Sequence, residues 1–298
     1  MSELDELIQV DADNVSNSRK ALANFDPELS RALDTAAGMF KTFCRCMEGA
    51  LDDSADWATL DGCGTELGID ADTLVSLIRT NARDATLDRA RAAWLRLYAR
   101  RARGIVLLLL QRQFMWAATD LLRMRLTATI GYGRQQAESL ALLFLMRDDA
   151  TIADRWMKLA ADNDGKRFHR EFQGRILEVI ERLDLGGAYE GGSGTSMHVR
   201  LASAIRGLSL DRKPNEIWLG YQDVRSNDPF SYYLEVLSFL GIQVRLFRAL
   251  GDAFPEVRDQ IWPGRVESFT RHVASLWERL EKLFPEQCEK YRRMGQGS

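Results

Sequence analysis

One charged pair meets an almost wholly apolar segment near the middle of the chain. Arg134 and Glu138 are one helical turn apart, and the seven residues at 140–146 read Leu-Ala-Leu-Leu-Phe-Leu-Met. A helix that is apolar on every side must be enclosed by other helices. Burying ions is unfavourable unless they are paired, and removing one partner of a buried pair typically costs about 3–5 kcal/mol. The sequence therefore predicts that Arg134 and Glu138 form either a clamp in the core or the floor of a site.

Apolar residues recur at helical spacing along most of the chain, which has only 6 proline residues in 298. Residues 52–64 and 186–194 are expected to be irregular, residues 1–25 to be irregular or a frayed helix, and residues 217–221 to form a short strand or an extended loop. A break or bend is expected at Gly131–Gly133. Helices are predicted over 27–47, 69–80, 86–130, 133–146, 152–161, 166–184, 196–208, 230–251 and 264–284. Strands and helices do not alternate, so the predicted fold is a mainly α multi-helix bundle.

Charge is unevenly distributed along the chain. The net charge is −3 overall, but −10 over residues 1–84 and +7 over residues 85–125. We therefore expect a small acidic helical region at 1–84 and the main helical bundle at 85–298. A row of arginines lies at helical spacing: Arg89, Arg96, Arg100 and Arg103. These arginines could face an external polyanion, or they could pair with acids of the N-terminal region, such as Asp52, Asp53, Asp56 and Asp61. The pI near 5.8 favours the internal pairing.

Several classes of protein are disfavoured by composition. The N-terminus is acidic and lacks the basic-then-apolar order of a signal peptide. The longest apolar run, residues 104–110, is shorter than the roughly 20 residues that span a bilayer and is predicted to be a buried helix. With 3 His and 4 dispersed Cys, no metal site and no cofactor are expected. We expect a cytoplasmic protein without membrane contact.

Two polar patterns surround the central pair. The first is a stripe of residues at helical spacing: Asp120, Arg123, Thr127, Gly131, Arg134 and Glu138. These residues lie on one face of the helix if the helix continues through Gly131. The second is a glycine-rich segment that holds Tyr189 and Ser193 and precedes a helix with His198 in its first turn. Free N–H groups at a helix start suit an anion, although no P-loop signature is present. A solvated helix face and a capped connection are the simpler interpretations of these patterns.

The order of these motifs resembles a group of bacterial all-helical proteins of unknown function. The resemblance covers about residues 105–250. It rests on Arg134-x3-Glu138, Trp156, the segment Asp164-Gly-Lys-Arg-Phe168, and Tyr189-x3-Ser193-x4-His198. It implies that Arg134, Glu138, Ser193 and His198 converge in one place, and Tyr189 of the same motif is predicted as a further binding residue. It implies no established activity.

Two further motifs suggest nucleic acid. Arg265-x6-His272 has the spacing of the Arg/His pair in helical ribonucleases of the toxin and phage-defence kind, although about one such match is expected by chance in this composition. Residues 57–80 have the glycine and apolar spacing of a helix-turn-helix unit. However, Asp70 and Asp72 would head its recognition helix, where DNA-binding proteins place cations.

These patterns favour a non-catalytic interaction or structural module in which Arg134 and Glu138 stabilise the bundle. The first alternative is a metal-independent RNA-binding or RNA-cleaving protein that uses Arg134, Glu138 and His198, or Arg265 and His272. The second is a DNA-binding regulator that uses residues 57–80. The sequence is compatible with an RNA partner, a protein partner or a homodimer.

Overall fold

The computed structural model describes residues 3–50, 52, 54–80, 83–123, 126–162, 165–195, 208–213, 216–221, 229–255 and 262–295. The helices there are α1 (Glu3–Phe25), α2 (Pro27–Ala50), α3 (Ser54–Leu67), α4 (Ala71–Arg79), α5 (Ala85–Leu122), α6 (Leu126–Asp148), α7 (Ala150–Asp162), α8 (Gly165–Arg182), α9 (Gly186–Thr195), α11 (Pro229–Ala253), α12 (Trp262–Leu283) and α13 (Pro285–Gly295). Strands β1 (Leu208–Lys213) and β2 (Glu216–Tyr221) pair antiparallel, with Leu208 opposite Tyr221. The fold is mainly α, as predicted, and β2 shows which of the two structures expected at 217–221, a short strand or an extended loop, is present.

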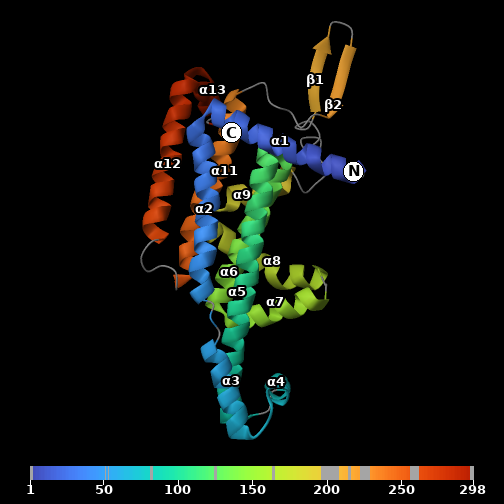
Figure 1. Cartoon of the computed structure of the whole chain (residues 1–298), viewed down its shortest axis with the longest axis vertical. Helices are drawn as coiled ribbons and strands as arrows, with labels where there is room; N and C mark the ends of the chain where they lie inside the picture. The colour runs from blue at the N-terminus through green and yellow to red at the C-terminus, as the bar shows by residue number, and fades with distance from the viewer. Residues whose placement is uncertain are drawn as a thin grey trace.

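The molecule is elongated around the long helix α5 (Figure 1). Helices α2 and α12 run along the same axis, α1 crosses one end, and α3 and α4 lie at the other end beside the start of α5. Helices α7 and α8 project to one side, and the β1–β2 hairpin extends from the end near α1. The N-terminal part of α5 therefore packs against α3 and α4, whereas the rest of α5 packs against the larger group of helices.

The main core joins helices that are far apart in the sequence. The Phe40 ring of α2 lies 4.9 Å from the Phe114 ring of α5 and 4.8 Å from the Phe247 ring of α11, between centroids. All three side chains are almost completely buried. Residues of α6 and α12 belong to the same apolar cluster. Aromatic contacts of this kind add to the free energy of burial itself.

A second, smaller apolar cluster lies at the α3–α4 end. It consists of buried residues of α3, α4 and the first half of α5: Leu60, Cys63, Leu74, Ile78, Leu87, Ala90, Ala93 and Leu97. Residues of α1 and α2, such as Leu22 and Phe40, belong instead to the main core. The boundary predicted at residue 84 therefore does not coincide with the division between the two clusters.

The predicted start of α2 is confirmed in detail. Asp26 caps the helix, because its Oδ1 accepts a hydrogen bond of 2.9 Å from the backbone N–H of Glu28. Pro27 occupies the first helical position, where its missing N–H is harmless. The cap is also buried, since Asp26 is only 1% exposed.

Two segments predicted to be irregular are helical, and residues 1–25, predicted to be irregular or a frayed helix, are helical as well. Residues 52–64 fall largely in α3, residues 1–25 largely in α1, and the glycine-rich residues 186–194 in α9. Each helix places an apolar side chain in one of the two clusters: Leu60 of α3 is buried in the smaller one, Leu22 of α1 is buried in the main core, and Tyr189 of α9 packs on the main core. Tertiary contacts of this kind override weak intrinsic helix propensity.

The break between α5 and α6 lies earlier than predicted. Helix α5 ends at Leu122 with Arg123 as its C-cap, and α6 runs through Gly131 and Gly133 without interruption. The predicted polar stripe is therefore split between two helices. Asp120 and Arg123 form their own ion pair at the end of α5, with 3.3 Å between Oδ1 and Nη1. The side chain of Thr127 lies outside the described residues.

Candidate functional site

Arg134 and Glu138 form a partly buried ion pair on α6. The Nε of Arg134 donates a hydrogen bond of 3.0 Å to Oε1 of Glu138. The two side chains are 19% and 31% exposed. The spacing of four residues places them on the same face of the helix, so the pair was predictable from sequence.

Tyr189 joins this pair from α9. The Nη2 of Arg134 donates a hydrogen bond of 3.3 Å to the Tyr189 hydroxyl, and the guanidinium carbon lies 4.7 Å from the centre of the Tyr189 ring. A cation over an aromatic face is attracted by the ring quadrupole. The charge of Arg134 is therefore in contact with a carboxylate and an aromatic ring of its own chain.

Gln173 of α8 completes the arrangement. Its Nε2 donates a hydrogen bond of 2.8 Å to the same Tyr189 hydroxyl. The resulting group, which we call the Arg134 cluster, consists of Arg134, Glu138, Gln173 and Tyr189 and links α6, α8 and α9. Sequence reasoning missed Gln173, because a single glutamine beside the apolar face of α8 carries no distinguishing pattern. The geometry is that of a clamp between helices.

The structure brings together three of the five residues predicted to form a binding site. Arg134, Glu138 and Tyr189 are in contact, directly or through one another. The side chain of Ser193 and the whole of His198 lie outside the described residues. In the described part of the chain, no group of three or more His, Cys, Asp or Glu residues is arranged to hold a metal ion.

Helix α6 also buries the uncharged polar side chains of Gln136 and Ser139, which are neighbours of Arg134 and Glu138 in the sequence. Gln136 and Gln243 are both 0% exposed and exchange hydrogen bonds of 3.1 and 3.4 Å between their amide groups. Ser139 donates a hydrogen bond of 3.1 Å to Gln113 of α5. Satisfied buried polar groups specify how helices register against each other. These contacts fix α6 against α5 and α11.

Arg265 and His272 line one open groove of about 390 Å³ between α2 and α12. The other lining residues come from both helices: Thr35, Gly38, Met39, Thr42, Ser268 and Phe269. The Nε2 of His272 lies 3.4 Å from a carboxylate oxygen of Glu28. Glu28 also accepts two hydrogen bonds from Nη1 of Arg31. The two predicted residues therefore share a groove.

The arginine row of α5 pairs largely with acids of its own chain. Arg96 and Arg100 both donate to the carboxylate of Asp56, which is 5% exposed, with 3.1 Å between Arg96 Nε and Oδ1. Arg89 pairs with Glu66. Arg103 instead donates to the carbonyl oxygen of Ala253 and lies over the Phe254 ring. The pairing expected with the N-terminal acids is confirmed for Asp56.

The segment 57–80 forms two helices joined by a tight turn. Gly68 has a φ of 67°, a conformation that suits glycine. Asp70 caps α4, accepting from the backbone N–H and the hydroxyl of Thr73. These hydrogen bonds hold the pKa of Asp70 below its ordinary value. The first turn of α4 is thus negatively charged at neutral pH, which is unfavourable for contact with phosphates.

Helix α5 carries a row of exposed apolar side chains that the sequence did not reveal. Ile105, Leu108, Leu109, Met115 and Trp116, which we call the α5 row, are 45%, 60%, 39%, 50% and 44% exposed. The run at 104–110, expected to be buried, is therefore buried on one side only, through Val106, Leu107 and Leu110. Contiguous exposed apolar surface commonly marks an interaction site.

By length and composition, α5 is also the one helix of the described residues that could cross a membrane. Within its most apolar window, 44% is buried inside the protein. A long core helix of a water-soluble protein passes the same test. Arg103 and Gln113 are buried, so the part of α5 between them packs against the surrounding helices.

No protein-family model matches this chain, and neither curated proteins nor solved structures include a significant match.

Proposed function

We propose that this protein is a non-catalytic interaction module that associates with a second copy of itself through the α5 row. The observation that carries the proposal is the exposure of five large apolar side chains along three turns of one helix. Burying such surface is favourable by roughly 25 cal/mol per Å² of apolar area. A contact surface of this kind needs no catalytic group.

The pattern of charges supports an antiparallel pairing of two α5 helices. Arg112 lies within the row and stacks over Trp116 of its own chain, with 5.7 Å to the ring centre. A parallel pair would place Arg112 of each copy beside Arg112 of the other. An antiparallel pair around the middle of the row places it beside Leu109, where its aliphatic stem can pack. The same patch then serves on both copies, as a two-fold interface requires.

We assign the Arg134 cluster a structural role in this association. It holds α6, α8 and α9 together, and Gln113 and Ser139 connect α6 to α5. A rigid helix loses little conformational freedom when it binds, so preorganisation favours association. In this account the paired charges stabilise the platform that presents the α5 row.

The test is the oligomeric state of the full chain. Sedimentation velocity over a hundredfold range of concentration should reveal a monomer–dimer equilibrium. Leu108→Lys should shift it to monomer at all concentrations, because it adds a cation to a row that already holds Arg112. Leu283→Lys is the matched control, since Leu283 is 50% exposed on a different helix, and should dimerise as the wild type does. A wild-type chain that stays monomeric throughout would overturn the proposal.

The proposal includes a cytoplasmic location and assigns no membrane contact to the α5 row. Co-sedimentation with vesicles of mixed neutral and anionic lipid checks this part directly. Recovery of the wild type with the vesicles, and its loss in Leu108→Lys but not in Leu283→Lys, would assign the row to lipid instead of to a second copy.

A second candidate function is RNA binding or RNA cleavage at the α2–α12 groove. It is favoured by one observation, that Arg265 and His272 line the same groove. An arginine and a histidine that line one groove suit contact with a phosphodiester, since the guanidinium binds phosphate oxygens. Cleavage of a structured RNA by the wild type, abolished in His272→Ala and in Arg265→Ala, would support this function. Absence of both binding and cleavage in the wild type would remove it.

A further inference from the structure

We infer that the hollow between α3 and α4 binds a basic segment of a protein partner, which inserts one apolar side chain. This site is separate from the α5 row and goes beyond the self-association proposed above. The hollow measures about 350 Å³ and opens to solvent at the α3–α4 end of the molecule. Its size suits a leucine or an aromatic side chain.

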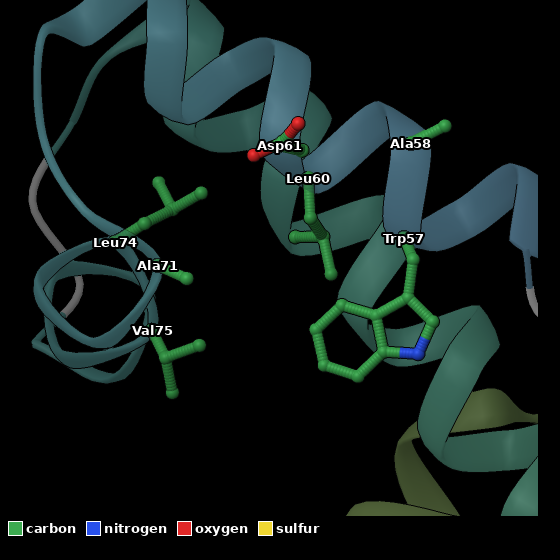
Figure 2. A pocket seen from close by; sticks show the side chains of 7 residues that line it. All are labelled: Trp57, Ala58, Leu60, Asp61, Ala71, Leu74 and Val75. Atoms are coloured by element: carbon green, nitrogen blue, oxygen red, sulfur yellow. The ribbon is translucent and has the colours of Figure 1, made fainter.

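The walls of the hollow are mostly apolar and come from two helices. Figure 2 shows Ala71, Leu74 and Val75 of α4 on one side, and Leu60 and Trp57 of α3 on the other. Trp57 is 38% exposed, whereas Leu60 and Leu74 are buried at 4% and 1%. The floor is therefore part of the smaller apolar cluster, while the rim includes an exposed indole. Anchor pockets at protein interfaces combine these features.

The charge around the hollow specifies the partner. Residues 54–80, all of them described, hold five acids and one base. Asp56 and Glu66 are neutralised by arginines of α5, and Asp70 is used as a helix cap. Asp61 lies at the rim, is exposed and forms no ion pair within the described residues. A cation next to the inserted side chain would meet Asp61.

Trp57 strengthens the preference for an apolar occupant. The guanidinium of Arg101 of α5 lies 5.2 Å from the centre of the Trp57 ring. The Trp57 side chain also lines the hollow, with the edge of its indole toward Leu60 and Val75 (Figure 2). A docked apolar side chain would remove part of the exposed Trp57 indole from water, and Asp61 would select a basic neighbour over an acidic one.

The test uses the full chain and two synthetic peptides. Both peptides carry leucine at every third or fourth position; the other positions are lysine in one and glutamate in its counterpart. Fluorescence anisotropy should show saturable binding of the lysine peptide, and binding of the glutamate peptide weaker by at least tenfold. Equal binding of the two peptides, or binding of neither, would overturn the inference.

Substitutions of residues that line the hollow test whether the lysine peptide binds there. Ala71→Phe fills the hollow from α4 and should weaken binding of the lysine peptide at least tenfold. Ala58→Phe, on the opposite wall, is the second test if the first variant disturbs α4. Asp61→Asn should weaken binding severalfold, whereas Asp72→Asn makes the same charge change outside the hollow and should stay within twofold. Equal effects of Asp61→Asn and Asp72→Asn would reveal unspecific attraction and overturn the inference.

The two proposals fail independently. A monomeric wild type that binds the lysine peptide in the hollow would overturn the α5 pairing and leave this site standing. A dimer that does not distinguish the two peptides would do the reverse.

Discussion

The hydroxyl of Tyr233 donates a hydrogen bond of 3.1 Å to Oδ2 of Asp26, a residue 207 positions earlier in the chain. The same oxygen accepts a hydrogen bond of 2.7 Å from Nε of Arg279. Asp26 therefore joins α11 and α12 to the start of α2 while its other oxygen caps that helix. A single carboxylate that is 1% exposed connects three helices.

Replacing Asp26 with alanine should be among the most destabilising single substitutions in the protein. It removes a helix cap, leaves the Tyr233 hydroxyl without its acceptor and deprives Arg279 of its partner. We expect a loss of about 3–5 kcal/mol in the free energy of unfolding. Urea denaturation followed by circular dichroism checks this value. Asp34→Ala, which removes an exposed ion pair with Arg19, is the control and should change stability by less than about 1 kcal/mol.

Alkaline pH should destabilise the protein through its buried tyrosines. Burial raises the pKa of Tyr232 from 10.0 to about 12. Burial and the nearby Asp26 carboxylate also raise the pKa of Tyr233. Because the folded state holds these protons more tightly than the unfolded state, the contribution is fully present below pH 10 and is lost as the pH rises toward about 12.

Tyr232→Phe isolates this effect from the lysines that titrate over the same range. The variant should lose less stability than the wild type between pH 10 and pH 12, by about 2 kcal/mol. Thermal unfolding at closely spaced pH values provides the measurement. Parallel stability curves for the two proteins would show that Tyr232 does not titrate differently on folding.

Arg134→Lys should destabilise the bundle although it conserves the charge. Lysine cannot reproduce the planar donors that reach both Glu138 and Tyr189, nor the stacking on the Tyr189 ring. We expect a loss of about 2 kcal/mol in the free energy of unfolding, the usual size for hydrogen bonds to charged groups. Tyr189→Phe keeps the ring and removes the hydroxyl, so its effect should be smaller. Unchanged stability of Arg134→Lys would contradict the role of the cluster as a clamp.

Salt should loosen the α3–α4 unit selectively. Its ion pairs with α5 include Arg89–Glu66 and Arg96–Asp56, in which both arginines are more than half exposed and open to screening. Hydrogen exchange of α3 and α4 amides should therefore accelerate at high salt, while the interior residues of α6 remain protected. Asp56→Asn should produce the same acceleration at low salt. Uniform exchange behaviour across the chain would exclude selective opening of this unit.

Features that are encoded locally could be predicted from the sequence. The cap at Asp26 and the pair Arg134–Glu138 depend on residues within four positions of each other, so both were predictable. Tyr189 is predicted as a binding residue only by the resemblance, and its contact with Arg134 joins residues 55 positions apart. Gln173 was missed because its role depends on how α8 packs against α9. Long-range packing of this kind leaves no periodic signal.

The same reason explains the errors in secondary structure. The glycines of α9 and the polar residues of α3 suggest loops, and only burial against α6 and α5 makes these segments helical. The apolar run at 104–110 predicts a buried helix, but only one side of it is buried. Sequence cannot tell which face of an apolar helix lacks a neighbour, so the α5 row emerged only from the structure.

The most direct test of the proposed self-association is hydroxyl-radical footprinting of Met115, with Trp277 as an internal reference. Both side chains are exposed in one copy of the chain, at 50% and 38%, but only Met115 lies in the α5 row. We expect the oxidation rate of Met115 to fall severalfold as protein concentration rises through the dimerisation range, while that of Trp277 stays constant. A Met115 rate that is the same in dilute and concentrated protein would contradict burial of the α5 row by a second copy.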